Sequence, residues 1–140
     1  MTDFDLDGFL PYQINVLAGR LSREFGALYR DRFGISIPEW RVLAHLGQAG
    51  RVSVREIYAR VDMDKSKVSR AAARLESAGY ITKTQSRADR RLVDMALTDK
   101  GRALMAELAP IAEAFEAELT GRLGEAAPDF RAAVRRLLET

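Results

Sequence analysis

Apolar residues recur at three- and four-residue steps along most of the chain. Between residues 9 and 33 this stripe consists of Ile14, Leu17, Ala18, Leu21, Phe25 and Leu28. Because such spacing places side chains on one face of an α-helix, it predicts a long amphipathic helix in this region. Pro11 suits the first turn of that helix, where its missing amide costs nothing, and Gly34 suits the C-terminal end.

Capping signals indicate where the next helices begin. The segments Ser36–Glu39 and Ser53–Glu56 are each typical of a capping box, in which a hydroxyl and a carboxylate satisfy free backbone amides reciprocally. Residues 62–64 suit a tight turn, after which Asp64 can cap a helix from Lys65 to about Ala78. The sequence therefore predicts a second helix, a short third helix and a longer fourth one.

The hydrophobic period changes after the fourth helix. Residues 80–85 are β-prone, and apolar residues recur at two-residue spacing within residues 91–97. The polar loop 86–90 separates these stretches, which predicts two strands in a β-hairpin, and Thr98 can cap the long helix that follows. A short helix, a turn, a longer helix and a hairpin follow one another in the order of a winged helix-turn-helix.

The expected fold is mainly α with a small β-hairpin wing. We expect one domain over residues 1–140, in which residues 36–97 form the winged helix-turn-helix region. The helices at 9–33 and 98–140, the last beginning near Pro128, carry more apolar positions than a small winged domain covers, so we expect them to be dimerisation helices. Candidates for an intersubunit bundle are Leu10, Val16, Leu17, Ile111, Phe115, Leu119, Val134, Leu137 and Leu138. The alternative is that these helices pack only on their own domain.

The composition fits one folded domain with an unevenly distributed charge. The 140 residues are 47% apolar and 30% charged, and cysteine is absent, which excludes disulfides, thiolate zinc sites and thiol-oxidation sensing. Residues 51–91 hold 11 Lys/Arg and 5 Asp/Glu, a net charge of +6, which leaves 11 and 15, a net charge of −4, for the rest of the chain. One contiguous segment therefore carries a positive field suited to a polyanion.

The helix predicted at 65–78 leaves a basic face for solvent. Its apolar stripe consists of Val68, Ala71, Ala72 and Leu75. The remaining arc holds Lys65, Ser66, Lys67, Ser69, Arg70 and Arg74. Long cations and short hydroxyls suit a helix that enters a DNA major groove, where Lys and Arg contact guanine or phosphate. The alternative is a solvated surface helix, but a hairpin loop containing several arginines favours DNA, because an arginine at a wing tip can enter a minor groove.

Several stretches of the chain carry a familiar pattern. Residues 89–98 hold an Asp-x-Arg followed by a strand that ends in Leu-Thr, and the segments 38–43, 65–80 and 98–101 accompany it. Together they resemble the wing, the second helix, the recognition helix with its exit, and the start of the next helix in the MarR family of transcription regulators. The likeness runs from about Phe9 to Thr140 in order and length.

The resemblance implies a role for each charged residue of the wing loop. Arg91 is implied to enter the minor groove, with Asp89 holding its guanidinium, while Arg87 and Arg90 lie on nearby phosphates. An arginine oriented by a carboxylate loses less entropy on binding. Whether Arg90 or Arg91 enters the groove stays open, and a surface pair of Asp89 and Arg91 that only stabilises the turn is the alternative.

The resemblance also implies a homodimer and a small-molecule effector. Regulators of this family commonly bind a small, often aromatic or anionic, molecule between the dimer helices and the winged domain. Residues with a ring face or a cation that we expect to line such a site are Tyr12, Tyr29, Trp40, Arg41 and His45. Each of them can instead be an ordinary core or surface residue.

Enzyme chemistry has little support in this sequence. His45 is the only histidine, so without cysteine neither a His-based triad nor a paired-His metal site can be built in one chain, and we expect no cofactor. The start of the chain lacks the pattern of a targeting peptide, and no apolar run approaches the ~18 residues of a membrane span. We therefore expect a cytoplasmic protein without membrane contacts.

The function that these features predict is transcription regulation. We expect a sequence-specific double-stranded-DNA-binding regulator, a ligand-responsive repressor that acts as a homodimer on a palindromic operator. Two half-sites about one helical turn apart supply the affinity that a single recognition helix lacks. The alternative is a helical protein-interaction module that uses the winged domain to contact a partner protein.

Overall fold

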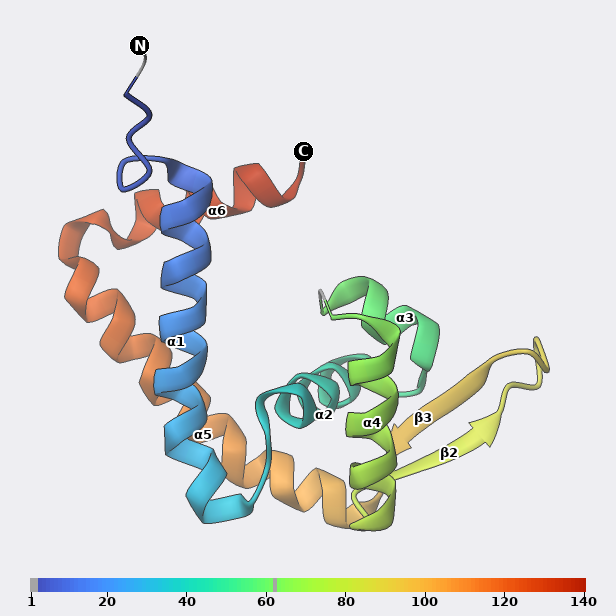
Figure 1. The fold of residues 1–140 in the computed structure, drawn as a ribbon. Coiled ribbons are helices and arrows are strands. Elements are labelled where there is room, and N and C mark those ends of the chain that lie inside the picture. Colours follow the sequence, from blue (N-terminus) through green and yellow to red (C-terminus); the bar gives the residue numbers. More distant parts are fainter. Residues whose placement is uncertain (1–2, 62) are drawn as a thin grey trace.

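The structure, a computed structural model, describes residues 3–61 and 63–140 of the chain. In chain order the elements are α1 (Leu10–Phe33), α2 (Ile37–Ala49), β1 (Val52–Ser53), α3 (Val54–Arg60), α4 (Lys65–Ser77), β2 (Ile81–Gln85), β3 (Val93–Leu97), α5 (Asp99–Leu123), a single 3-10 turn (Gly124–Ala126) and α6 (Ala127–Leu138) (Figure 1). The turn predicted at residues 62–64 includes Asp62, which lies outside the described residues.

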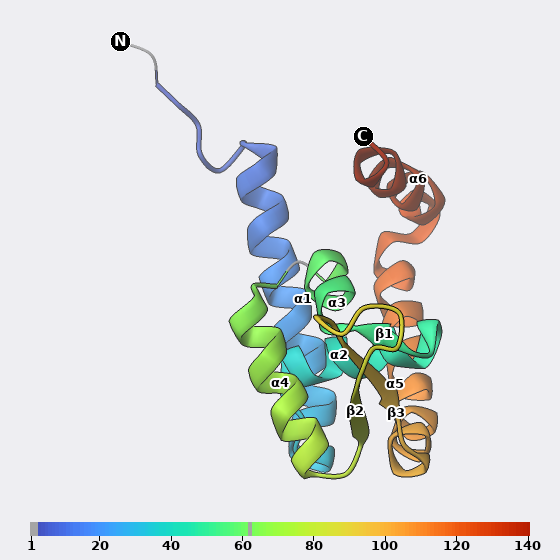
Figure 2. The same ribbon diagram turned by 90° about the vertical axis from the view of Figure 1, so that its right-hand side faces the viewer.

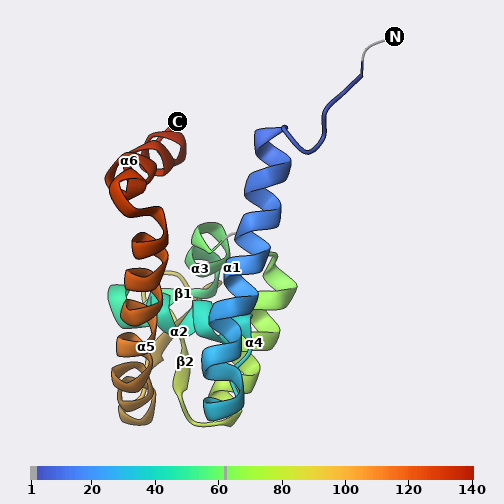
Figure 3. The same ribbon diagram turned by 90° about the vertical axis from the view of Figure 1, so that its left-hand side faces the viewer.

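The long helices α1 and α5 pack together and form one arm of the molecule (Figures 1 and 3). Helix α2 lies between this arm and α4, and it packs against α4, α5 and β3. Helix α6 lies at the same end of the molecule as the N-terminal end of α1. On the other side of α2, helix α4 and the strands lie next to each other and face the viewer in Figure 2.

Local capping confirms the predicted helix boundaries. In the boxes at 36–39 and 53–56, each serine hydroxyl accepts a hydrogen bond from the glutamate amide, and each glutamate side chain accepts one from the serine amide. Asp64 and Thr98 cap α4 and α5 with their side chains. Gly34, at φ 67°, ends α1 in the left-handed conformation that favours glycine. These boundaries depend on neighbouring residues only, which is why the sequence predicts them.

The wing belongs to a three-stranded antiparallel sheet of order β1-β3-β2. Strands β2 and β3 form the predicted hairpin, with Ile81 opposite Leu97. A third strand, which the sequence does not predict, completes the sheet, because β1 pairs Val52 with Met95 on the other edge of β3. With two residues, β1 is too short to show an alternating pattern in the sequence.

The core lies between α2, α4 and the sheet. Its fully buried side chains include Val42, Leu43, Ile57, Val68, Ala71, Ala72, Leu75 and Met95. Burial of an apolar side chain stabilises a fold by about 1.5–3 kcal/mol, so this cluster fixes the inner face of α4 against the body of the domain. The orientation of α4 then determines which of its side chains reach solvent.

The terminal helices keep much of their apolar surface exposed. On α1, Ile14, Leu17 and Leu28 of the predicted stripe are exposed, and no residue of α6 is buried among the residues that the structure describes. Exposed apolar area of this kind marks an interaction surface in a soluble protein. Within residues 3–61 and 63–140, no helix is both long enough and apolar enough to span a bilayer.

Candidate nucleic-acid interface

The outer face of α4 carries the residues that the sequence predicts for it. The four apolar residues of the predicted stripe are fully buried. The exposed residues of the helix include Lys65, Ser66, Lys67, Ser69, Arg70 and Arg74. The structure therefore brings the predicted cations and hydroxyls to one solvent-facing surface, with the cations concentrated in the N-terminal half of the helix.

The start of α4 is fixed by a single side chain. The Asp64 carboxylate accepts a hydrogen bond from Lys67 N at 2.8 Å. Such a cap contributes about 1 kcal/mol of helix stability, and its negative charge lies favourably near the positive end of the helix dipole. The cap thus holds the first turn, with the Lys65 and Lys67 side chains, in an ordered helical conformation at the surface.

The wing loop is held in shape by its own hydrogen bonds. Ser86 is buried, its amide donates to the Leu92 carbonyl at 3.0 Å, and its hydroxyl accepts a bond from Asp89 N at 3.3 Å. The Gln85 side-chain amide donates to the Arg90 carbonyl at 2.7 Å. A loop ordered in this way loses little conformational entropy when a ligand binds to it.

Asp89 orients the Arg91 guanidinium, as the resemblance implies. Arg91 N and Nε each donate to Asp89 Oδ1 at 3.0 Å, and Arg91 Nη2 donates to Oδ2 at 2.9 Å. These bonds from Arg91 lower the pKa of the Asp89 carboxyl, and the bond to Asp89 raises the pKa of the guanidinium. The Arg91 side chain is nonetheless 84% exposed, and Arg87 and Arg90 are exposed beside it.

A groove of about 300 Å³ separates the N-terminal half of α4 from the wing. Four of its lining residues are cations, namely Arg55, Lys65, Lys83 and Arg91. Within the part of the chain that the structure describes, no carboxylate lines this groove. Cations from α3, α4, β2 and the wing loop therefore surround one concave surface, an arrangement that attracts phosphate groups.

Two groove residues, Arg55 and Lys83, are not among the site residues that the sequence predicts. Arg55 lies on the exposed side of the short helix α3. Lys83 lies in the middle of β2 and forms an ion pair with Glu76, with Nζ and Oε1 3.7 Å apart. In the sequence, only the net positive charge of residues 51–91 indicated that Arg55 and Lys83 belong to a DNA-binding surface. Their position in the groove depends on how α3 and β2 pack, which the sequence does not show.

The residues predicted to line an effector site do not form one cavity. Trp40, Arg41 and His45 line a shallow pocket of about 340 Å³ next to α3, whereas Tyr29 lines a separate pocket of about 250 Å³ at the start of α2. Tyr12 lies in the first turn of α1, about 25 Å along the helix from Tyr29 at 1.5 Å per residue. Within the single chain, the structure therefore brings Trp40, Arg41 and His45 together but not Tyr12 or Tyr29.

Two buried polar atoms lie in this region without a hydrogen-bond partner among the described residues, the Tyr29 hydroxyl and His45 Nε2. Burial raises the pKa of Tyr29 to about 12, although the positive charges of Arg41 and Arg30 oppose the shift. Burial also lowers the pKa of His45, and the charge of Arg60 adds to that effect. Buried polar atoms of this kind normally have partners, so they identify places where a ligand or water can bind.

An aromatic cluster connects this region to the helical arm. The Phe25 ring lies 5.0 Å from the ring of Trp40 and 5.3 Å from that of Phe115, between centroids. The cluster thus joins α1, α2 and α5. Among residues 3–61 and 63–140, no group of three His, Asp or Glu side chains is placed to hold a metal ion.

The chain is similar in sequence to known transcription regulators. Residues 33–92 match the sequence profile of the MarR family. Over 71 residues the chain is 37% identical to the HTH-type transcriptional repressor MdtR of Bacillus subtilis (strain 168), a match that covers 51% of this chain and 46% of that protein. The chain spans less than half the length of two of the curated relatives that it matches, 45% of one and 46% of the other.

Solved structures share the whole fold. A MarR/EmrR family transcriptional regulator from Acinetobacter sp. ADP1 is 30% identical, with a TM-score of 0.85 over 97% of this chain and 96% of that chain. BpsR of Bordetella bronchiseptica, whose DNA binding is regulated by 6-hydroxynicotinic acid, is 25% identical, with a TM-score of 0.82 over 99% of this chain and 96% of that chain. The similarity therefore extends from the helix-turn-helix region into the terminal helices.

Proposed function

The chain belongs to the MarR family of transcriptional regulators, a DNA-binding family, and we propose that it acts as a ligand-responsive repressor that binds a palindromic operator as a homodimer. The observation that carries this proposal is the groove between α4 and the wing, in which Arg55, Lys65, Lys83 and Arg91 converge. None of the described residues that line this groove is a carboxylate. A concave surface with several cations and no opposing negative charge suits the phosphate backbone of DNA.

Helix α4 is the element that reads the sequence of bases. Its 13 residues span about 20 Å, enough to lie across a major groove about 12 Å wide. Lys65, Lys67 and Arg70 contact guanine edges or phosphates, and the hydroxyls of Ser66 and Ser69 fit where the backbone lies close to the bases. The exposure of all these side chains and the capped start of the helix support this role.

The wing makes the second contact. Arg91 enters the minor groove, where a narrow groove concentrates negative potential, and Arg87 and Arg90 bind the adjacent phosphates. The bidentate pair with Asp89 supports the choice of Arg91 over Arg90, because it holds the guanidinium in one orientation before DNA binds. Arg55 and Lys83 add phosphate contacts between the wing and α4.

The terminal helices form the dimer interface. Most of the apolar residues that the sequence predicts for an intersubunit bundle are at least partly exposed in the single chain, and Leu10, Leu137 and Leu138 are among the most exposed. A two-fold axis through these helices places two copies of α4 on two half-sites, which requires a palindrome with half-sites about 34 Å apart or a multiple of it.

The effector is a small aromatic anion that binds near α2. Trp40 offers a ring face, and Arg41 and His45 offer a cation and a buried ring nitrogen in the same pocket. Arg41 Nη2 also lies 3.4 Å from Ser22 Oγ on α1, so a ligand that bound Arg41 would act on both helices. The regulation of BpsR by 6-hydroxynicotinic acid, an aromatic acid, is consistent with this class of ligand.

Recovery of bound genomic DNA fragments, followed by fluorescence-anisotropy titration, tests the proposal. We expect tight binding to fragments that share a palindrome, with an affinity that falls steeply between 50 and 200 mM salt, as it does when several phosphates are neutralised. Addition of candidate aromatic acids should release the DNA. If no fragment binds in a salt-dependent manner, the proposal fails, and the winged domain is better explained as a surface for a partner protein.

A further inference from the structure

The end of α4 is bound by the start of α5. The last carbonyl groups of an α-helix have no partner within the helix and need one outside it. After α4, three successive carbonyls, those of Ala78, Gly79 and Tyr80, each accept a hydrogen bond from residues 98–100. The buried face of α4 packs against α2 and α3, so these bonds are a separate, polar connection between the recognition helix and α5.

Thr98 makes two of these bonds and also begins α5. Its hydroxyl donates to the Gly79 carbonyl at 2.6 Å and accepts a bond from Gly101 N at 3.0 Å. Its amide donates to the Tyr80 carbonyl at 3.0 Å. One residue therefore caps α5 and binds the backbone that leaves α4, so neither helix end can move alone without breaking a hydrogen bond.

Lys100 makes the third bond and adds a charge. Its Nζ donates to the Ala78 carbonyl at 2.7 Å and lies 4.7 Å from the centroid of the Tyr80 ring. A cation at the C-terminal end of a helix interacts favourably with the helix dipole. Among the described residues, no carboxylate lies within ion-pair distance of Lys100, which does not line the groove between α4 and the wing. We term Thr98, Lys100 and the three carbonyls the α4–α5 clasp.

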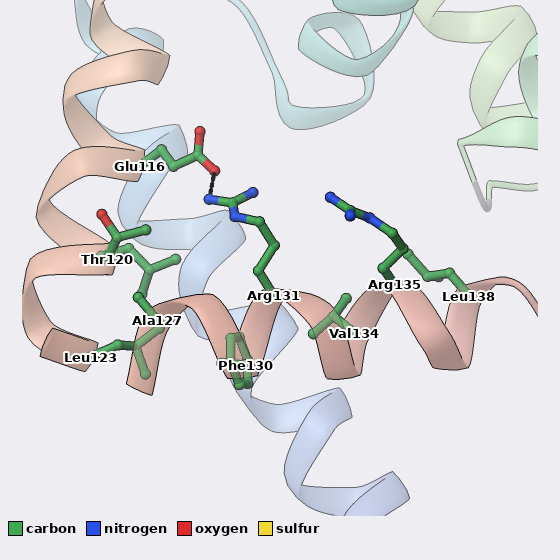
Figure 4. Close-up of a pocket in the computed structure, with 10 residues that line it drawn as sticks. Glu116, Thr120, Leu123, Ala127, Phe130, Arg131, Val134, Arg135 and Leu138 are labelled. Atoms are coloured by element: carbon green, nitrogen blue, oxygen red, sulfur yellow. Dashed lines mark hydrogen bonds and ion pairs between the residues drawn. The ribbon is translucent and has the colours of Figure 1, made fainter. Parts of the chain in front are cut away.

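Helix α5 connects the clasp to the helical arm. Its 25 residues span about 37 Å, and along this length it packs against α1. At its other end α5 meets α6, where Val134 and Leu138 are among the residues assigned to the proposed dimer interface (Figure 4). In the proposed homodimer, the two copies of α4 are therefore connected through two clasps and two α5 helices.

Small changes at the clasp have large effects at the DNA-binding end of α4. The helix is about 20 Å long, so a rotation of about 5° about its C-terminal end moves its N-terminal end by about 1.7 Å. Hydrogen bonds to base edges require donor–acceptor distances of about 2.7–3.2 Å, so a shift of this size breaks them. Two such shifts, one in each copy, also change the distance between the recognition helices.

We propose that Lys100 is a positioning residue for DNA recognition, which together with Thr98 fixes the angle between α4 and α5. The two clasps then set the distance between the recognition helices of the homodimer, and so the half-site spacing that the protein accepts. This inference rests on the proposed function, and it gives a role in DNA binding to a residue outside the groove and the exposed face of α4. A contact that only stabilised the fold would not affect this angle.

The absence of cysteine allows the angle to be measured with spin labels, independently of DNA. Nitroxides on Ser66→Cys in α4 and Glu113→Cys in α5, both exposed positions, report the distance between the helices by double electron–electron resonance. Labelled chain is diluted with an excess of unlabelled chain, so that only the two labels within one chain contribute. In Lys100→Met, which keeps an unbranched side chain but lacks the donor and the charge, we expect a broader distance distribution. Lys100→Arg should keep the narrow distribution of the unmodified chain.

Arg102→Met is the matched control. Arg102 lies in the same first turn of α5, but its Nη1 donates to the Leu97 carbonyl, at 3.1 Å, instead of to the end of α4. We expect this variant to leave the distance distribution unchanged. The proposal is wrong if Lys100→Met gives the same distribution as the unmodified chain, or if Arg102→Met broadens the distribution as much.

Titrations on operators with altered half-site spacing test the consequence for recognition. We expect Lys100→Met to bind the native operator about tenfold more weakly, and to lose less on operators lengthened or shortened by one base pair, because loosely held helices accept more spacings. Affinity for unrelated DNA should stay the same, and Lys100→Arg should retain the native preference. A lower free energy of unfolding in urea with an unchanged spacing preference would show that Lys100 only stabilises the fold.

The two measurements separate this inference from the proposed function. If the unmodified chain binds no DNA in a salt-dependent manner, the proposed function is wrong and the role of Lys100 in recognition with it, while the label distances still show whether Lys100 fixes the angle. If the chain binds its operator but Lys100→Met changes neither the label distances nor the spacing preference, the proposed function stands and the positioning role is wrong.

Discussion

Glu39 accepts a hydrogen bond from Arg74, with Oε1 and Nε 3.2 Å apart, and this pair joins the start of α2 to the outer face of α4. The same Glu39 oxygen accepts a bond from the Ser36 hydroxyl at 2.8 Å, so the capping box of α2 and the recognition helix share one carboxylate. Glu39 is mostly buried, with 12% of its side chain exposed. The sequence predicts that Arg74 lies on the DNA-binding face of α4. In the structure, its Nε already donates a hydrogen bond to Glu39.

This geometry predicts that Glu39 and Arg74 act on DNA binding as a unit. Glu39→Gln keeps a residue that functions in capping boxes but removes the charge that holds Arg74. We expect Glu39→Gln and Arg74→Ala to lower operator affinity by similar amounts, and the double variant to lose no more than either alone. Anisotropy titrations of the unmodified chain, the two single variants and the double variant give the coupling free energy between the two residues. Additive losses of affinity would show that Arg74 contacts DNA independently of Glu39.

The second prediction concerns the wing. Arg91→Ala should weaken operator binding by about 1–3 kcal/mol, that is roughly fivefold to 150-fold, and leave the melting temperature unchanged because the side chain is exposed. Asp89→Asn should cost less, since an amide oxygen still accepts the Arg91 amide bond but no longer attracts the guanidinium. Unchanged affinity of Arg91→Ala in the same titration would rule out the assigned role of Arg91.

Arg70 and Lys83 form a matched pair that separates base reading from phosphate binding. If Arg70 contacts a base, Arg70→Ala should cost about 1–3 kcal/mol on the operator and relax specificity at one position. Lys83→Ala should weaken all sequences equally and reduce the slope of log affinity against log salt by about 0.9. Titrations on the operator and on single-base variants at several salt concentrations distinguish these behaviours, and a uniform loss for Arg70→Ala would make it a phosphate contact.

The ion pair of the wing also predicts a titration. The pKa of Asp89 is held below its unfolded value of about 3.9, so its contribution to wing stability is complete above that pH and is lost as pH falls through the folded pKa. The wing pair therefore stays intact throughout the neutral range. In Arg91→Ala we expect the carboxyl carbon of Asp89, followed by nuclear magnetic resonance, to titrate at higher pH. An unchanged midpoint would show that Arg91 is not the cause of the shift.

The sequence predicts well what depends on neighbours along the chain. The caps at Ser36, Ser53, Asp64 and Thr98 are formed by side chains that lie within three residues of the amides they bind, so each is visible in a short segment. The buried stripe of α4 is likewise visible, because helical periodicity alone determines which residues share a face. These local features are sufficient to predict a winged helix-turn-helix.

What the sequence does not predict depends on how distant segments pack. Arg55 and Lys83 join the groove only because α3 and β2 both approach α4, and Glu39 lies 35 positions before the arginine that it binds. Tyr12 and Tyr29 share a helix and a residue type, yet they lie far apart on a helix of 24 residues. The order of residue types within one segment does not show which distant residues come into contact or how far apart two residues lie in space.

The last prediction concerns two glycines of α5 that differ in their surroundings. A Cβ at Gly101 would lie 2.1 Å from the Tyr80 carbonyl oxygen, where the end of α4 leads into β2, and neither backbone can move freely. We expect Gly101→Ala to destabilise the fold by about 1–3 kcal/mol, the range typical of overpacking. At Gly121 nothing lies within 4 Å of the added Cβ, so Gly121→Ala should stabilise the helix by up to about 1 kcal/mol. Urea unfolding of both variants measures the difference, and equal free energies of unfolding would contradict the close approach of α5 to the wing.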